Sequence, residues 1–570
     1  PLIRLPALLD STALLREINV QNLRYEMGWG KPEALAFDQI TGTPSDLKID
    51  FSTLDQFAAR VNAQDVRPLF AMTYCPNPLK SREGWPAWKD LPNDLAAWQS
   101  LNQRYAAHLR LTGADYEIWN EPDINDPGGK MFFSGGPADY QRLYHSAASG
   151  IRQGDREASV GGAAVAYDLR YFTPLLSEPL DFASIHAYDN YAVQVGNLRG
   201  ALGNRPDLPI FLTEYASFTS FGKDAPVSRH PAAMRFFRDV KGMLALPDVT
   251  RVYWAQWVDD NLGLLTADGH RKALFNAFKI YGMMPVDRNA VSPDGADGVN
   301  LLASSDDHSA GVVIWNENAA DRPVTINLTH LPFARGAMQI YRIDKDNGSY
   351  IDNAASENLR VLQTSQCRAA KASWTGAVPG ESIVFLKISD GQSASKSAPL
   401  GRLVRTYGWF WDRNAPAYAD FDPRTFIGRL GLGDRAFGIA QIGGVIADPV
   451  QRLSVQVQKS GPFAPQDANS LLGLRVDFPD GTGRYVRSVL YHDRLYNPKR
   501  NSPLPWGKGG ATPDRAIFKA EMDSGKPFAI DLARLAPPNW NRKRILISFI
   551  LQNAGRDSQA RFTLTQGTQK

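Results

Sequence analysis

A chain of 570 residues, of which 43% are hydrophobic and 21% charged, is long enough for about three or four domains of roughly 150 residues, and its composition excludes wholesale disorder. The 63 basic residues nearly balance the 59 acidic ones, so the net charge of +4 predicts neither a nucleic-acid partner nor an anionic membrane surface. No apolar run approaches the ~18 residues that a membrane-spanning helix needs, so we expect no membrane span.

From residue 1 to about residue 290 the sequence alternates short apolar runs with segments of helical period. This pattern predicts repeated βα units around a parallel sheet, and we expect a (β/α)8 TIM barrel over residues 1–290. A closed barrel needs one strand more than the sequence shows, and either Pro1–Leu5 supplies it or it precedes the first residue of this chain. The expected strands are Asn22–Met27, Val66–Met72, Tyr116–Trp119, Ser159–Ala163, Phe182–Ala187, Ile210–Thr213 and Val252–Trp257.

Beyond Pro285 the helical period stops and short strands separated by turn residues follow. We predict a β-sandwich at 291–390, a linker at 391–400 rich in Ser, Gly and Lys, and a second β-sandwich or jelly roll at 401–570. The last domain carries tryptophans that either stack on sugar rings or fill its core, so it is a candidate carbohydrate-binding module. These are Trp409, Trp411, Trp506 and Trp540.

Polar residues stand at the carboxyl ends of two expected barrel strands. Asn120 and Glu121 precede the strand-stopping Pro122, and Glu214 directly follows a later strand. The carboxyl ends of barrel strands meet at the face that holds the active site, so the two carboxylates are expected to share one cavity. Glycoside hydrolysis needs such a pair, one group to protonate the leaving oxygen and one to attack or to activate water. The alternative is that these glutamates are ordinary salt-bridge partners or caps.

Glu117 competes with Glu121 for the catalytic role, because alternate residues of a strand point to the same side. Glu117 lies four residues deeper in the strand. We interpret it as a structural carboxylate that pairs inside the barrel with a basic group such as Arg24 on a neighbouring strand.

Two motifs resemble those of a known family. Trp119-Asn120-Glu121-Pro122 and Leu212-Thr213-Glu214 are similar to the acid/base and nucleophile motifs of retaining (β/α)8 glycosidases, and most similar to those of glycoside hydrolase family 39. That family includes β-xylosidases, α-L-iduronidases and bacterial exopolysaccharide hydrolases. The resemblance covers roughly the first half of the chain. Further matches lie at Asp50-Phe51-Ser52, Val160-Gly161-Gly162 and Asp181-Phe182-Ala183-Ser184-Ile185-His186-Ala187-Tyr188.

The resemblance implies a retaining glycosidase that cleaves a poly- or oligosaccharide by double displacement, with Glu121 as acid/base and Glu214 as nucleophile. It also implies a set of substrate-binding residues around them. In that set Asn120 would bind the sugar 2-hydroxyl, His186 and Tyr188 would line the site beside the nucleophile, and Trp257 would be a sugar platform. We add Arg24 and Tyr74 to the expected substrate-binding residues.

This chemistry needs no metal or organic cofactor, and the expected partner is the carbohydrate substrate. The chain begins at Pro1, which suits a protein that is secreted or periplasmic after its signal peptide has gone, or a trimmed chain. The first alternative function is a non-catalytic carbohydrate-binding protein on the same fold. The second is an esterase, against which the absence of a Gly-x-Ser-x-Gly elbow counts. The oligomeric state stays open.

Overall fold

The chain is described from a computed structural model. The description of its backbone covers residues 9–30, 40–64, 66–82, 87–126, 129–130, 132–203, 205, 208–217, 228–246, 248–285, 287–289, 291, 296–391, 402–411, 418–422, 427–432, 439–447, 449–461, 463, 471–479, 485–493, 514–520, 522, 525–538, 540 and 544–566. The expected first barrel strand at Pro1–Leu5 and the linker residues from 392 to 400 lie outside it.

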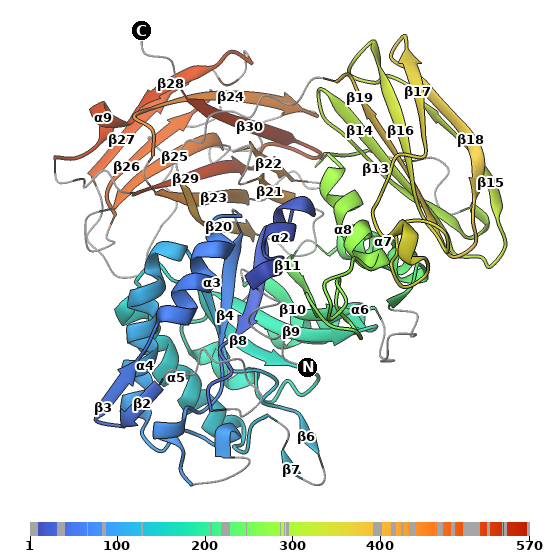
Figure 1. The fold of residues 1–570 in the computed structure, drawn as a ribbon. Helices are drawn as coiled ribbons and strands as arrows, with labels where there is room; N and C mark the ends of the chain where they lie inside the picture. Colours follow the sequence, from blue (N-terminus) through green and yellow to red (C-terminus); the bar gives the residue numbers. More distant parts are fainter. Residues whose placement is uncertain are drawn as a thin grey trace.

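The first domain is a nearly closed parallel barrel (Figure 1), as the alternating pattern predicted. Seven strands form one sheet in the order β1-β4-β5-β8-β9-β10-β11, and the two end strands β1 and β11 approach each other. β8 is apolar throughout, as expected of a strand covered on both faces, whereas the other six strands also contain polar or charged residues. The strands are β1 (Asn22–Glu26), β4 (Arg67–Met72), β5 (Asp115–Ile118), β8 (Val160–Val165), β9 (Phe182–Tyr188), β10 (Ile210–Ala216) and β11 (Val249–Trp254).

Amphipathic helices cover the outside of the barrel. In α4, Trp98, Leu101 and Tyr105 recur at spacings of three and four and are buried, which is the stripe that a helix packed on a sheet requires. Asp94 begins this helix by accepting hydrogen bonds from two backbone N–H groups of its first turn. The helices are α2 (Ala13–Glu17), α3 (Ser52–Asn62), α4 (Leu95–Leu109), α5 (Pro137–Gly154), α6 (Tyr191–Ala201), α7 (Pro231–Met243) and α8 (Ala273–Met283), with short hairpins β2 (Ile40–Thr43)–β3 (Asp46–Ile49) and β6 (Asn125–Asp126)–β7 (Gly129–Lys130).

The last barrel strand begins earlier than predicted. β11 spans Val249–Trp254, so Trp257 lies beyond its end rather than on it. The predicted strand was Val252–Trp257, which leaves out Arg251, a charged residue within the observed strand. The guanidinium of Arg251 is nevertheless accommodated there, since it forms an ion pair with the fully buried carboxylate of Asp115 on β5.

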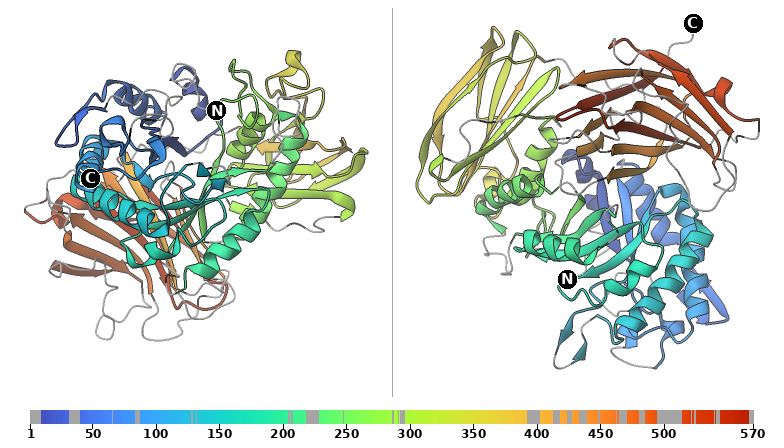
Figure 2. Two further views of the ribbon diagram at one scale, coloured as in Figure 1. Left: turned by 90° about the horizontal axis from the view of Figure 1, so that it is seen from below. Right: turned by 180° about the vertical axis from the view of Figure 1, so that it is seen from behind.

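A β-sandwich follows, and its core is continuous with that of the barrel. Trp315, Ile343 and Phe385 of the sandwich belong to the same buried cluster as the barrel helices, and Figure 2 shows the sandwich packed beside α7 and α8. One sheet has the order β12-β13-β14-β19-β16-β17 and the other pairs β15 with β18. The strands are β12 (Asp287–Asn289), β13 (Val299–Ser305), β14 (Ser309–Asn316), β15 (Arg322–Leu328), β16 (Arg335–Ile343), β17 (Gln363–Arg368), β18 (Ala372–Val378) and β19 (Ile383–Ser389).

The C-terminal domain is a second β-sandwich with a separate apolar core. Its sheets have the orders β20-β23-β29-β25-β26-β27 and β21-β22-β30-β24-β28. Among the described residues, no helix is both long and apolar enough to cross a membrane. The strands are β20 (Arg402–Trp411), β21 (Tyr418–Asp422), β22 (Ile427–Gly431), β23 (Ile439–Ala447), β24 (Arg452–Ser460), β25 (Leu471–Pro479), β26 (Tyr485–His492), β27 (Asp514–Lys519), β28 (Phe528–Asp531), β29 (Arg544–Gln552) and β30 (Gln559–Gln566), with the helix α9 (Leu532–Leu535).

Candidate active site

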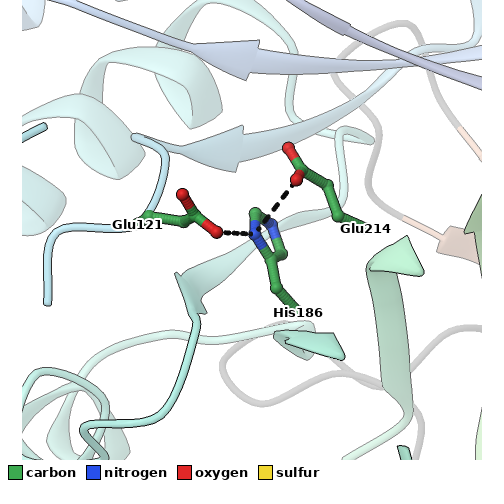
Figure 3. Close-up of side chains that lie close together, drawn as sticks. All are labelled: Glu121, His186 and Glu214. Carbon is green, nitrogen blue, oxygen red and sulfur yellow. Dashed lines mark hydrogen bonds and ion pairs between the residues drawn. The ribbon is translucent and has the colours of Figure 1, made fainter. Parts of the chain in front are cut away.

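The predicted carboxylates meet at the carboxyl end of the barrel strands. Glu121 lies just after β5 and Glu214 lies near the end of β10, and His186 of β9 stands between them (Figure 3). The Nδ1 atom of His186 is 2.9 Å from Glu121 Oε1 and 3.5 Å from Glu214 Oε2. One oxygen of each carboxylate and the imidazole nitrogen all lie within 4.8 Å of one another.

The turn that carries Glu121 has an unusual backbone. Trp119 and Glu121 both have left-handed φ angles, 72° and 43°. Residues with a Cβ rarely adopt such angles, because they cost energy that contacts with the surrounding structure must offset. Two contacts with the end of β8 fix this turn. The Glu121 N–H donates to the Ala164 carbonyl at 3.1 Å, and the buried Asp123 carboxylate accepts the N–H groups of residues 166–168 at 2.9 to 3.1 Å. The acid/base candidate is therefore held at a defined position.

Both oxygens of Glu214 receive hydrogen bonds. Arg24 Nη1 donates to Oε1 at 2.9 Å, and the hydroxyl of Tyr188 donates to Oε2 at 2.7 Å. Burial alone would raise the pKa of this carboxyl group. Together, the positive charges of His186 and Arg24 and the hydrogen bonds from Tyr188 and Arg24 outweigh burial, so the pKa of Glu214 is lowered below its usual range. The arrangement favours an ionised Glu214.

Glu121 is shifted in the opposite direction. Burial raises its pKa, and the negative charge of Glu214 adds to that effect. The hydrogen bond and charge of His186 act against the shift without cancelling it, so the pKa of Glu121 stays above its usual range. Two neighbouring carboxyl groups with pKa values moved apart are the arrangement in which one serves as acid and the other as anion.

Arg24 connects the residues around Glu214. Its Nε donates to Glu117 Oε2 at 2.7 Å and its Nη2 donates to Asn120 Oδ1 at 2.8 Å, besides the bond to Glu214. Burial works to lower the pKa of this guanidinium, but the surrounding carboxylates outweigh it and raise the pKa. The interpretation of Glu117 as the deep, structural partner of Arg24 is confirmed, and its side chain is fully buried.

Replacing Arg24 by methionine is expected to lower the stability of the barrel. The change would leave the fully buried Glu117 carboxylate without its cation, which typically costs about 3 to 5 kcal/mol. Thermal unfolding should show a clearly lower midpoint for Arg24→Met. The double variant Arg24→Met/Glu117→Leu, which removes the stranded charge, should recover part of the loss. An unchanged midpoint in the single variant would contradict this account of the pair.

The cluster of Glu121, His186 and Glu214 also contains the residue types that bind metal ions. The contacts of Glu214 favour acid and nucleophile roles for these residues over metal binding. The guanidinium of Arg24 already donates to Glu214 at 2.9 Å, and a divalent cation at that carboxylate would be repelled by it. The donor set therefore suits carboxylate chemistry better than metal binding.

The remaining predicted residues fall into two groups. Asn120 and Tyr74 lie within the cluster, since the Asn120 amide N–H donates to the Tyr74 hydroxyl at 3.3 Å. Trp257 is positioned differently. Its indole N–H donates to Ser11 Oγ at 2.8 Å, its ring lies against Phe275, and the residue is only 7% exposed.

Sequence reasoning missed two acidic residues of this region. Glu26 ends β1 beside Arg24, and Asp123 anchors the turn of Glu121. The rule that located Glu121 and Glu214 would also have found Glu26, because Glu26 is a polar residue at the carboxyl end of a barrel strand. Nothing in the sequence distinguishes Asp123 from the helix caps that aspartate commonly forms in loops.

The first half of the chain is similar to known proteins. The sequence profile described as "Glycosyl hydrolases family 39" matches residues 34–330. A curated β-xylosidase from Caldicellulosiruptor saccharolyticus is 25% identical over 356 residues, which cover 52% of this chain and 71% of that protein.

Solved structures show the same fold at lower identity. The family 39 enzyme from Xanthomonas axonopodis pv. citri superposes with a TM-score of 0.57 at 18% identity, covering 68% of this chain and 92% of that one. A family 39 β-xylosidase from Caulobacter crescentus gives a TM-score of 0.54 at 18% identity, covering 68% and 95%. These likenesses concern the fold.

Proposed function

Because the chain belongs to glycosyl hydrolase family 39, we propose that Glu214 is the nucleophile and Glu121 the acid/base of its retaining mechanism. The observation that carries this assignment is the opposite direction of the two pKa shifts, up for Glu121 and down for Glu214. The approach of their oxygens, within 4.8 Å, supports it further. Retaining glycosidases hold their carboxyl groups ~5 to 5.5 Å apart, whereas inverting enzymes leave room for a water between them.

In the first half of the proposed reaction Glu214 attacks the anomeric carbon and forms a glycosyl ester, while Glu121 gives its proton to the leaving oxygen. Arg24 and Tyr188 each occupy one Glu214 oxygen in the free protein, so they orient the carboxylate and keep it ionised. In the second half Glu121, now a carboxylate, takes a proton from the water that attacks the ester. The sugar leaves with its original anomeric configuration.

The substrate is a carbohydrate, and we propose a neutral β-xyloside or a closely similar sugar at the end attacked by Glu214. The support is the 25% identity with a curated β-xylosidase across half of this chain. A non-catalytic role on the same fold is less favoured, since sugar binding alone does not call for two adjacent carboxyl groups with opposite pKa shifts. The secreted or periplasmic location and the carbohydrate-binding role of the C-terminal domain stay predictions.

A panel of 4-nitrophenyl glycosides tests the proposal. We expect hydrolysis of the β-xyloside, and proton NMR of the earliest product should show the β anomer before it equilibrates. Release of the α anomer first would contradict retention. Absence of hydrolysis across the panel and on xylo-oligosaccharides would contradict the xyloside assignment, while hydrolysis of another glycoside would correct the sugar and leave the mechanism in place.

Replacing Tyr188 by phenylalanine should move the acidic limb of the pH profile. The Tyr188 hydrogen bond helps to lower the pKa of Glu214, so Glu214 keeps its charge as pH falls until that lowered value is reached. Without the hydroxyl the pKa rises, and the acidic limb of kcat/KM should move to higher pH by about one unit.

The rate of Tyr188→Phe at the optimum should fall roughly tenfold. Tyr341→Phe is the matched control, because that hydroxyl donates to Gln339 in the β-sandwich. An acidic limb that stays in place in Tyr188→Phe would show that Tyr188 does not tune the nucleophile.

A further inference from the structure

A third partly exposed carboxylate lies beside the proposed catalytic pair. Glu26 is the last residue of β1, two residues after Arg24, so both side chains point to the same face of the strand. Its Oε1 is 3.5 Å from Arg24 Nη1, and its Oε2 accepts a hydrogen bond from the Tyr74 hydroxyl at 3.3 Å. The mechanism above makes no use of this residue.

The position of Glu26 relative to the nucleophile follows from a shared partner. The same Nη1 atom of Arg24 contacts Oε1 of Glu26 and Oε1 of Glu214, so the two carboxylates are close neighbours. Their side chains also have the same exposed fraction, 19%, whereas that of Glu117 is 0%. Glu26 therefore lies beside the nucleophile, and part of its side chain is exposed to the same extent as that of Glu214.

The charges of the cluster are unbalanced toward the negative side. With Glu121 protonated, the carboxylates of Glu26, Glu117 and Glu214 remain. The two cations of the cluster, Arg24 and His186, already contact these groups or Glu121. An anionic substrate group placed here would meet carboxylates without a cation of the cluster left to pair with it, and this repulsion is strong in a buried site.

We propose that Glu26 is a specificity-determining residue, which accepts hydrogen bonds from hydroxyl groups of the sugar held against Glu214 and rejects sugars that carry a carboxylate on the ring. This inference rests on the proposed function and narrows its substrate class to neutral glycosides. Uronides, whose ring bears a carboxylate at C5, should be excluded by charge rather than by size.

Three matched substrates separate charge from size. The 4-nitrophenyl β-D-xyloside, β-D-glucoside and β-D-glucuronide share the configuration of C1 to C4 and differ at C5, which carries hydrogen, a hydroxymethyl group or a carboxylate. For the unaltered protein we expect kcat/KM on the glucuronide to be at least about tenfold below that on the glucoside. A glucuronide hydrolysed as fast as the glucoside would overturn the proposal without any variant.

The variant Glu26→Gln keeps the shape and a hydrogen-bond acceptor but removes the charge. We expect it to raise the ratio of glucuronide to glucoside hydrolysis by about tenfold. Glu178→Gln is the matched control, because Glu178 precedes β9 at the opposite end of the barrel, where it contacts His145. The control should leave the ratio unchanged.

The outcomes distinguish this inference from the assignment of the catalytic pair. An unchanged ratio in Glu26→Gln, in a protein that still hydrolyses the xyloside with retention, would overturn the role of Glu26 alone. Should the variant unfold at a lower temperature, the ratio remains measurable below that temperature, because both substrates are compared on the same protein. Loss of all retaining hydrolysis in the unaltered protein would instead reject the proposed function.

Discussion

Replacing Glu214 by alanine is expected to lower hydrolysis of the β-xyloside by roughly ten thousandfold or more, because a covalent step cannot start without its nucleophile. The cavity left by the side chain would still be lined by Arg24 and Tyr188, which donate to Glu214 in the unaltered protein. A small anion such as azide can bind these donors and attack the anomeric carbon from the side that Glu214 occupied.

Azide rescue provides the measurement for Glu214→Ala. The expected product is an α-glycosyl azide, inverted relative to the β-glycoside substrate, and its rate of formation should rise with azide concentration. Glu178→Ala, at the amino end of β9, should keep full activity and should form no glycosyl azide. Substantial hydrolysis by Glu214→Ala without azide would show that another residue attacks the sugar.

Replacing Glu121 by glutamine is expected to have a strongly substrate-dependent effect. General acid catalysis contributes ~10²- to 10⁴-fold, and this loss should appear on xylo-oligosaccharides, whose leaving group needs a proton. The 4-nitrophenyl xyloside has a good leaving group, so its bond cleavage should be much less affected. Similar losses on both substrates would contradict the acid role.

The pH profile gives a second readout for Glu121. Because its pKa is raised, Glu121 stays protonated above the usual glutamate range and loses its proton as pH rises through the raised value. The lowered pKa of Glu214 sets the acidic limb, so the profile of the unaltered protein should be bell-shaped. In Glu121→Gln the basic limb should disappear while the acidic limb remains.

The barrel and the β-sandwiches could be predicted from the sequence, because the spacing of apolar residues is visible within each short segment of the chain. The barrel strands contain short apolar runs, and the apolar residues of the outer helices repeat at three and four residues, so both could be recognised without a structure. Strand ends were less certain: β11 begins at Val249, whereas the prediction began it at Val252. Arg251, which the prediction left out, pairs with Asp115, a residue far away in the sequence, and no local pattern contains that pairing.

For the candidate site, too, the sequence predicted positions along the chain but not the contacts between residues that are far apart in it. Glu121 and Glu214 could be predicted because each directly follows an apolar strand and all barrel strands end at one face. Their roles could not be obtained from position alone. The opposite pKa shifts depend on which groups surround each carboxylate, and His186 contacts both of them from β9. The expectation that Trp257 is a sugar platform came from the family resemblance and stays a prediction.

The central claim is that Glu214 forms the covalent intermediate. Incubation with an activated 2-deoxy-2-fluoro-β-xyloside should trap that intermediate, since the fluorine slows hydrolysis of the ester more than its formation when the leaving group is good. Peptide mass spectrometry should then find the fluorosugar on the peptide that contains Glu214, with one label per active site and return of activity as the ester turns over. A label on Glu121 or Glu26, or steady hydrolysis of the β-xyloside with no label on any carboxylate, would contradict the account.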